Sequence, residues 1–184
     1  MKTSFYTDKE LLDLGFLSIG KNVLLSRKAS IYSAATISIG NNVRIDDFCI
    51  LSGKIDLGSN IHISAYSAIY GSMGVIMEDF TGLSPRTTIY SAMDDFSGNY
   101  LIGPIHPEEA TNVRGGLVHI KRYSHIGANS IIFPNIVIEE GVVVGAASVV
   151  KENLSEWGIY AGIPVKFIKE RSKNLLQYIL TDEG

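Results

Sequence analysis

A period of six residues runs through this chain and restricts its fold more than any other feature. From Ile120 to about Ser155 the sequence divides into six blocks, IKRYSH, IGANSI, IFPNIV, IEEGVV, VGAASV and VKENLS. Each block opens on isoleucine or valine, and its fifth residue is small or apolar. This period fits neither the 3.6-residue repeat of a helix nor a hairpin. It predicts an all-β solenoid in which each block forms one short strand and a turn, with three strands to a coil. The alternative, an ordinary set of short buried strands, does not require one constant spacing.

The same rhythm continues through the first half of the chain. Twelve further block openers are aliphatic or methionine: Ile19, Leu25, Ile31, Ile39, Ile45, Leu51, Leu57, Ile63, Ile69, Met77, Leu83 and Ile89. Two extra residues follow the blocks at Ile31 and Ile69, and the corners of a solenoid can absorb such insertions. We therefore expect one domain over residues 1–184, with the solenoid occupying 19–155.

The rhythm stops after Ile89 and resumes at Ile120. The intervening excursion, residues 90–119, contains Asp94, Asp95, His106 and Arg114. Long departures from regular structure carry function more often than not, so we expect candidate site residues here.

Two terminal segments flank the predicted solenoid. Thr7 and Glu10 have the spacing of a helix capping box, which predicts a short helix over 8–14 within an N-terminal cap of residues 1–18. After the last block, residues 156–184 form a C-terminal extension. Its apolar residues at helical spacing predict a short α-helix over 172–180; they are Leu175, Leu176, Ile179 and Leu180.

Composition narrows the possible partners. The net charge of −3 does not suggest a nucleic-acid surface. Cys49 is the only cysteine, which rules out an internal disulfide and suits a reducing compartment. The first residues lack the apolar core of a signal peptide, and no apolar run approaches the roughly 20 residues that span a bilayer. We therefore expect a cytoplasmic protein with no membrane partner.

These features resemble the left-handed β-helix acyltransferases of the galactoside and maltose acetyltransferase type. The likeness covers Ile19 to Arg171 and is most specific in YAGIPVKFIK at 160–169, preceded by Ile126-Gly127-Ala128 and by VGAAS at 144–148. The resemblance implies a left-handed parallel β-helix and a homotrimer, with acyl-CoA as co-substrate in the groove between neighbouring subunits. We expect no metal, for the reason given below for the histidines.

The same resemblance suggests residues that bind CoA. Ala128 and Ala146 fall where backbone groups of the family hold the pantetheine arm, and a small side chain lets a ligand approach the backbone. Lys166 and Lys169 match the basic pair near the CoA phosphates, which ammonium groups bind well.

The catalytic position departs from the galactoside type. Those enzymes place a histidine at the start of the excursion, whereas this chain reads Tyr90-Ser91-Ala92-Met93-Asp94-Asp95. A carboxylate with a reference pKa of about 3.9 is a poor base for a hydroxyl group. An amine needs less help, because its neutral form is already nucleophilic, and Asp94 could orient it and stabilise its developing charge. Ser84 could hold the acceptor or the thioester oxygen.

The departure makes the chain similar to nucleotide-sugar N-acyltransferases of surface-glycan pathways. This similarity implies transfer of an acyl group from acyl-CoA to the amino group of a nucleotide-linked amino-deoxy sugar, with dTDP as the expected nucleotide. The acyl group, the sugar and the nucleotide-binding residues are not readable from the sequence; Arg86 and Arg114 are merely available cations.

Two alternatives stay open. A carbohydrate O-acetyltransferase could use His106 as its base. A zinc-binding or non-catalytic β-helix is the other, since γ-class carbonic anhydrases share this fold and bind zinc through three histidines. Zinc ligands must converge on one point at distances of about 2.0–2.1 Å. The spacing of His62, His119 and His125 in the sequence does not favour such a convergence.

Overall fold

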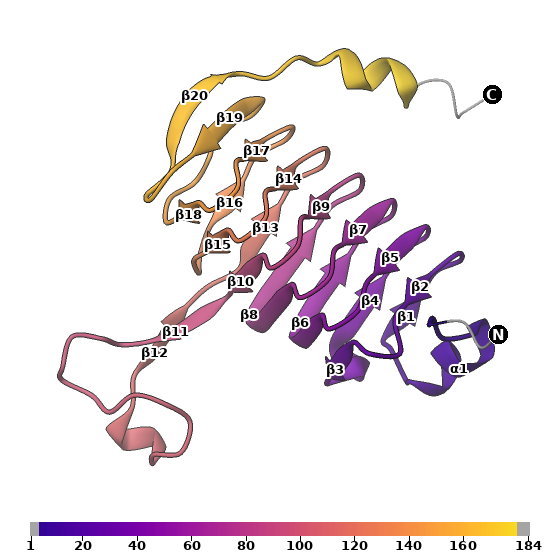
Figure 1. Cartoon of the computed structure of the whole chain (residues 1–184). Helices are drawn as coiled ribbons and strands as arrows, with labels where there is room; N and C mark the ends of the chain where they lie inside the picture. The colour runs from indigo at the N-terminus through magenta and orange to yellow at the C-terminus, as the bar shows by residue number, and fades with distance from the viewer. Residues whose placement is uncertain (1–3, 180–184) are drawn as a thin grey trace.

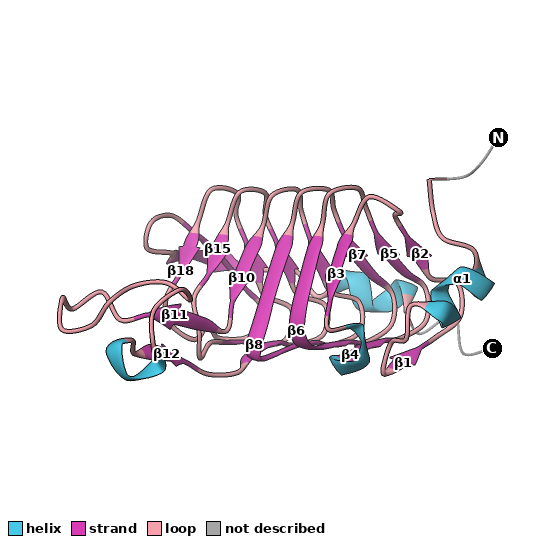
Figure 2. Ribbon diagram, turned by 90° about the horizontal axis from the view of Figure 1, so that it is seen from below, coloured by secondary structure: helices cyan, strands magenta, loops and turns pink. Residues whose placement is uncertain are grey.

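The chain winds into a triangular β-solenoid in the computed structural model, which describes residues 4–179 (Figure 1). Each coil contributes one strand to each of three faces, and the strands of successive coils pair in parallel (Figure 2). The predicted solenoid is confirmed, and the fold is that of a left-handed parallel β-helix.

The three faces are made of short strands. The first face contains β1 (Ser18–Ile19), β4 (Ile37–Ile39), β13 (Val118–Ile120) and β16 (Val137–Ile138). The second contains β2 (Leu24–Leu25), β5 (Val43–Ile45), β7 (Ile61–Ile63), β9 (Gly82–Leu83), β14 (His125–Ile126), β17 (Val143–Val144) and β19 (Gly158–Ala161). The third contains β3 (Ser30–Tyr32), β10 (Thr88–Tyr90), β15 (Ile131–Ile132) and β18 (Val149–Val150). Two longer strands, β6 (Ile50–Leu57) and β8 (Ala68–Met77), run from the third face onto the first.

We call the corner between the first and second faces the first corner. The second corner joins the second and third faces, and the third corner joins the third and first. All variation in coil length falls at the third corner. It holds the short 3-10 helix η1 (Ala34–Thr36), the bend of β8 and the excursion between β10 and β13.

The block openers form the core. All except Ile19 and Ile31 are at most 2% exposed. Burying one such side chain fully is worth about 1.5–3 kcal/mol, so a stack of them holds the coils in register. Ile19 and Ile31 belong to the first coil, where a cap takes the place of a preceding coil. That cap includes α1 (Asp8–Asp13), whose Leu11 is buried and whose Thr7–Glu10 capping box is present as predicted.

The fourth residue of most blocks adopts left-handed backbone geometry. Asn22, Asn42 and Asn60 have φ of 56°, 55° and 60°, and each Asn side chain bonds the next along the first corner. Asparagine tolerates this conformation better than most residues. Farther along the same corner, the rings of Phe80, Tyr123 and Trp157 succeed one another. These repeated turns make the prism regular and place corner residues predictably.

The excursion begins and ends in a two-stranded ribbon. β11 (Ala92–Asp94) pairs antiparallel with β12 (Val113–Gly115), and the loop between them contains the 3-10 helix η2 (Glu108–Ala110). Figure 1 shows this ribbon and loop projecting away from the solenoid.

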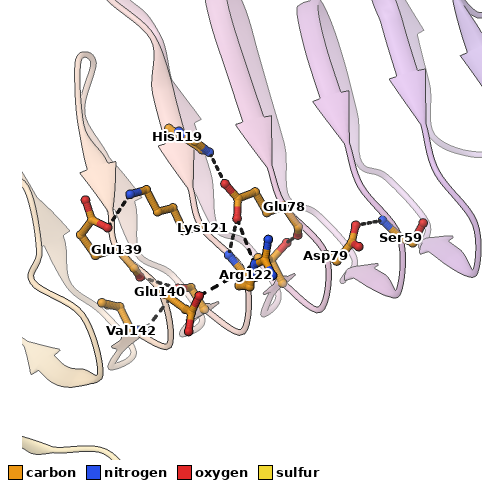
Figure 3. A network of polar contacts seen from close by, with 11 residues as sticks. Ser59, Glu78, Asp79, His119, Lys121, Arg122, Glu139, Glu140 and Val142 are labelled. Carbon is orange, nitrogen blue, oxygen red and sulfur yellow. Dashed lines mark hydrogen bonds and ion pairs between the residues drawn. The ribbon is translucent and has the colours of Figure 1, made fainter. Parts of the chain in front are cut away.

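A charged network fastens the coil that follows the excursion (Figure 3). The Glu78 carboxylate on the preceding coil pairs with His119 Nε2 at 2.8 Å and accepts the Arg122 backbone N–H at 3.1 Å. Lys121 donates to Glu139 at 2.6 Å, which extends the network to the next coil. The network therefore joins three successive coils: the coil before the excursion, the coil that follows it and the next one.

The C-terminal extension folds back over the solenoid. β20 (Lys166–Glu170) pairs antiparallel with β19, and Arg171 Nη1 donates to the carbonyls of Tyr123 and Gly141 at 2.6 and 2.9 Å. The final helix differs from the prediction: it is a 3-10 helix, η3 (Asn174–Tyr178), and Leu180 lies outside the described residues. Its N-cap residue, Lys173, makes no side-chain cap hydrogen bond, and the Asn174 N–H donates to the Ser172 hydroxyl at 3.2 Å. No helix within residues 4–179 is long and apolar enough to cross a membrane.

Candidate active site

A column of small residues follows the second corner through the last coils. Ala128 and Ala146 occupy the same place in successive coils, each two residues after a buried opener. Ala128 is half-buried and Ala146 is exposed. The glycine before Ala128 is required by close approach, because a Cβ on Gly127 would lie 2.6 Å from the Ala146 nitrogen. The column therefore exposes backbone groups that no large side chain covers.

The amide groups of this column differ from those at the first corner. There, the N–H groups of Lys21, Asn41 and Ser59 donate to side-chain oxygens of the next coil at 2.7–3.0 Å. At the second corner, the N–H groups of Ala128 and Ala146 find no acceptor anywhere in residues 4–179. Alanine has no oxygen with which to cap the neighbouring coil. Two outward donors thus stay available to a ligand.

Both predicted lysines lie on β20, at the end of this column. Lys166 pairs with Ala161 in the β19 register, and a Cβ on Gly145 would come within 2.9 Å of the Ala161 Cβ. Lys166 and Lys169 are both exposed, and neither has an ion pair within the described part of the chain. Their ammonium groups are free to meet phosphate.

Ser84 begins the second corner one coil before Ala128. Its hydroxyl lies 2.9 Å from His125 Nε2. The pKa of His125 is lowered, first because neighbouring coils partly desolvate the ring and then because of the positive charges of Arg171 and His62. The imidazole is therefore biased toward its neutral form at neutral pH.

Asp94 ends β11 and lies between two hollows. One, of about 450 Å³, has a mixed lining that includes Ser52, Ser72 and Thr111 as well as Tyr70, Met93 and Val113. The other, of about 340 Å³, is apolar, and its walls include Tyr90, Phe96 and Phe133. Asp94 is half-buried, so its carboxylate can meet a ligand in either hollow.

Asp95, the neighbour of Asp94, anchors the ribbon. Its carboxylate accepts the Ser97 backbone N–H and the Asn112 side-chain amide, each at 2.8 Å, and pairs with Arg114 Nη2 at 2.9 Å. The hydrogen bond from the Ser97 N–H is the main cause that holds the pKa of Asp95 below its usual range, with further contributions from Asn112 and Arg114. Sequence reasoning assigned Asp95 no role. Its short-range signal was the Asp-x-Ser turn, but the contacts to Asn112 and Arg114 cross the whole loop.

The histidines do not form a metal site. His62 pairs with Asp46 and His119 with Glu78, each at 2.8 Å, while His125 meets Ser84. The described residues contain no group of three or more His, Cys, Asp or Glu side chains that could hold a metal ion. His106 lies in the excursion but lines neither hollow beside Asp94, and no residue among 4–179 hydrogen-bonds its ring.

Within one chain, the predicted residues fall into two groups. Ser84, Ala128, Ala146 and the lysine strand follow the second corner, whereas Asp94 leaves from the third. Neither hollow beside Asp94 includes a residue of the second-corner column.

Comparisons with known proteins give a consistent result. No family model matches the chain. It is 47% identical over 176 residues to the dTDP-4-amino-4,6-dideoxy-D-glucose acyltransferase of Escherichia coli, covering 94% of this chain and 92% of that protein. AntD, an N-acyltransferase from Bacillus cereus solved with dTDP and 3-hydroxybutyryl-CoA, is 54% identical over the whole of both chains, with a TM-score of 0.96.

A more distant structure supports the fold alone. A hexapeptide-repeat acetyltransferase from Vibrio cholerae is 16% identical, with a TM-score of 0.62 over 90% of this chain and 80% of that one. The coil geometry and the two close relatives together place this chain in the family of left-handed β-helix, hexapeptide-repeat acyltransferases.

Proposed function

We propose that this chain is an acyl-CoA-dependent N-acyltransferase that acylates the amino group of a dTDP-linked amino-deoxy sugar. The observation that carries the proposal is the position of Asp94. Its carboxylate lies between two hollows, on the ribbon that Asp95 anchors. An enzyme that activates a hydroxyl group needs a base at this position. The two close relatives support the substrate class. One is named for dTDP-4-amino-4,6-dideoxyglucose, and an AntD variant was solved with that sugar nucleotide and coenzyme A.

The second-corner column would bind acyl-CoA. The free N–H groups of Ala128 and Ala146 suit the carbonyl oxygens of the pantetheine arm, and the exposed ammonium groups of Lys166 and Lys169 suit its phosphates. With the phosphates at β20, the thioester end would run down the column toward Ser84.

The reaction is a direct transfer. The neutral amine of the sugar attacks the thioester carbonyl, so that a C–N bond forms and the nitrogen becomes positive. The tetrahedral intermediate then expels the CoA thiolate, which takes up the proton that the nitrogen loses, so that the products are the amide and free CoA thiol. Asp94 accepts a hydrogen bond from the amine, orients its lone pair and stabilises the developing positive charge. Alignment of amine and thioester supplies much of the remaining rate.

Ser84 would contact the reacting groups at the thioester end of the column. The AntD structures include variants at an aspartate and a serine that carry the numbers 94 and 84, and AntD matches this chain along its whole length. This correspondence supports both assignments.

The active unit would be a homotrimer. Because Ser84 and Asp94 lie apart within one chain, a second copy must bring its excursion to the second corner of the first. The excursion also exposes apolar side chains that a partner would cover: Phe96 is 66% exposed, Leu101 51%, Ile102 53% and Ile105 87%. A closed ring of three copies provides three such sites.

The location and wider role follow from the co-substrate. Cys49 is a free, buried thiol, which suits a reducing cytoplasm that also contains acyl-CoA. The acylated sugar nucleotide would serve surface-polysaccharide synthesis.

A substrate comparison tests the proposal. Purified protein would be incubated with acetyl-CoA or 3-hydroxybutyryl-CoA and with dTDP-4-amino-4,6-dideoxyglucose, the free amino sugar or a simple galactoside. We expect acylation of the sugar nucleotide on nitrogen, detected by mass spectrometry. Acylation of the galactoside alone would overturn the proposal and favour an O-acetyltransferase that uses His106.

A further inference from the structure

The Ser84 hydroxyl is the one part of that residue left to rotate. The Ser84 backbone N–H donates to the Ile126 carbonyl at 2.9 Å, and its carbonyl accepts the hydroxyls of Thr87 and Ser67 at 2.8 and 3.2 Å. Among residues 4–179 the hydroxyl itself has one partner, His125 Nε2 at 2.9 Å. The direction of the Ser84 proton therefore depends on His125.

A glycine makes this contact possible. His125 stands on the outer side of β14, in register with Gly82 on β9. A Cβ at position 82 would lie 2.8 Å from His125 Nδ1 and 3.0 Å from Cε1. Real side-chain carbons do not approach so closely, so the imidazole lies across a space that a larger residue would fill. That placement lets the ring reach along β9 to Ser84.

The charges around His125 favour an accepting nitrogen. His62 on β7 and Arg171 on the C-terminal segment are the charged groups that act on the ring, and both repel a proton. The residues beside it on β9 and β17, Gly82 and Val143, carry no charge. Together with partial desolvation, these groups hold the pKa of His125 below its usual value.

We propose that His125 is a positioning residue for the transferase reaction. The Nε2 atom of neutral His125 accepts a hydrogen bond from the Ser84 hydroxyl. The lone pairs of the Ser84 oxygen then point outward, toward an N–H group of the acceptor amine. This role rests on the proposed function. It gives the second corner a defined contact to the amine, complementary to the one from Asp94.

Three variants and one control test the role. His125→Leu removes the acceptor, and Gly82→Ala displaces the ring while leaving both partners in the chain. We expect each to lower kcat for the dTDP-amino sugar by about tenfold, the worth of one well-placed hydrogen bond, with little change in KM for acyl-CoA. His125→Gln, which can still accept near Nε2, should recover most of the rate. His106→Asn, a histidine change outside the second corner, is the control and should stay near wild type.

The pH profile supplies a readout that a structural role would not move. The sugar amine titrates in every variant, so the ratio of wild-type to His125→Gln rates isolates the imidazole. We expect this ratio to fall as the pH decreases, at a pH lower than the ordinary histidine pKa of about 6.5, because the pKa of His125 is lowered and the protonated ring can no longer accept. A flat ratio, or full activity of His125→Leu with an intact fold, overturns the proposal.

A measurement without substrate separates this inference from the proposed function. In ¹⁵N-histidine NMR spectra, Ser84→Ala should shift the Nε2 resonance and the titration of His125 and leave those of His106 unchanged. If the wild type acylates no amine, the proposed function fails, and the positioning role fails with it even where the hydrogen bond is seen. If the wild type is active but Ser84→Ala leaves the His125 signals unchanged, the positioning role alone is overturned.

Discussion

Asp94 and Asp95 are adjacent, yet their surroundings give them different roles. Asp95 is 8% exposed and its carboxylate is engaged by Ser97, Asn112 and Arg114. Asp94 is half-buried, with no such partners among the described residues and with a hollow on either side. Asp95 is therefore suited to hold the ribbon, and Asp94 is suited to contact a ligand.

Replacing Asp94 by asparagine should reduce turnover strongly. Asparagine keeps the size of aspartate and can accept a hydrogen bond, but it lacks the charge that stabilises a developing ammonium. We expect kcat to fall about 100-fold, in line with the loss of one preorganised electrostatic group. The fold and CoA binding should persist, and the residual activity should rise with pH as more free amine forms.

His106→Asn is the comparison for this variant. It should change kcat little, because His106 is not among the residues that line the hollows beside Asp94. If His106→Asn abolished activity while Asp94→Asn was mild, the histidine would be the base and the O-acetyltransferase hypothesis would replace ours.

The lysine pair should act on one substrate only. Lys166→Ala combined with Lys169→Ala should raise KM for acyl-CoA several-fold and leave KM for the sugar nucleotide nearly unchanged. Both ammonium groups are exposed at the end of the second-corner column and contact no carboxylate in residues 4–179. Steady-state kinetics with each substrate varied in turn would measure this. An equal rise in both constants would indicate a role in folding instead.

At the scale of structural elements, the long excursion makes the pairing of the returning strand costly, and the charged network around Glu78 favours that pairing. β13 must pair with β8 although the 27 residues 91–117 separate the end of β10 from the start of β13, and closing so long a loop has an entropic cost. Glu78 meets His119 and Arg122 at the point where the chain returns (Figure 3). The contact favours one register for the returning strand.

Removing the Glu78 charge should make stability less dependent on pH. Burial opposes ionisation of Glu78, but hydrogen bonds from the Arg122 N–H and His119 and their charges outweigh it, so its pKa lies below the usual value. A carboxyl group with a lowered pKa stabilises the fold above its unfolded pKa, about 4.5, and this contribution is lost as the pH falls through the folded value.

Thermal unfolding across pH would measure this contribution. Glu78→Gln should lower Tm by about 2–4 °C at pH 7, the shift expected for roughly 1 kcal/mol in a chain of this size. The difference from wild type should disappear once the pH is well below 4.5. Glu140→Gln is the matched control, because the Glu140 carboxylate lies 3.8 Å from the same Arg122 side chain but accepts no hydrogen bond within residues 4–179. A difference that persisted unchanged at low pH would contradict the assignment.

At the scale of the whole molecule, the division of the proposed site between two corners predicts that the chain assembles into a trimer. Light scattering should give three times the 20.1 kDa mass of one chain. Active protein at the mass of a single chain would exclude the shared site.

Mixed subunits test the shared site directly. In a ring, each site would take Ser84 from one copy and Asp94 from its neighbour. Ser84→Ala and Asp94→Asn chains, each impaired alone, should recover activity when unfolded and refolded together. Random mixing in equal amounts would restore about a quarter of the sites. No recovery from well-folded mixed trimers would mean that both residues serve one chain.

The sequence by itself determined the solenoid, and its resemblance to the acyltransferases suggested where acyl-CoA binds. A six-residue period acts locally in every block, so the openers could be assigned to the core before any contact was known, and all of them except Ile19 and Ile31 are buried there. Ala128 and Ala146 were suggested by the resemblance to the family. The tertiary structure decided the rest: the anchoring of Asp95 by Asn112 and Arg114, the contact of Ser84 with His125 across Gly82, and the brief 3-10 turn at the C-terminus. These depend on which residues of different coils become neighbours after loops of irregular length. Such pairings leave no periodic signal, because they are set by the stacking of coils and not by local preference.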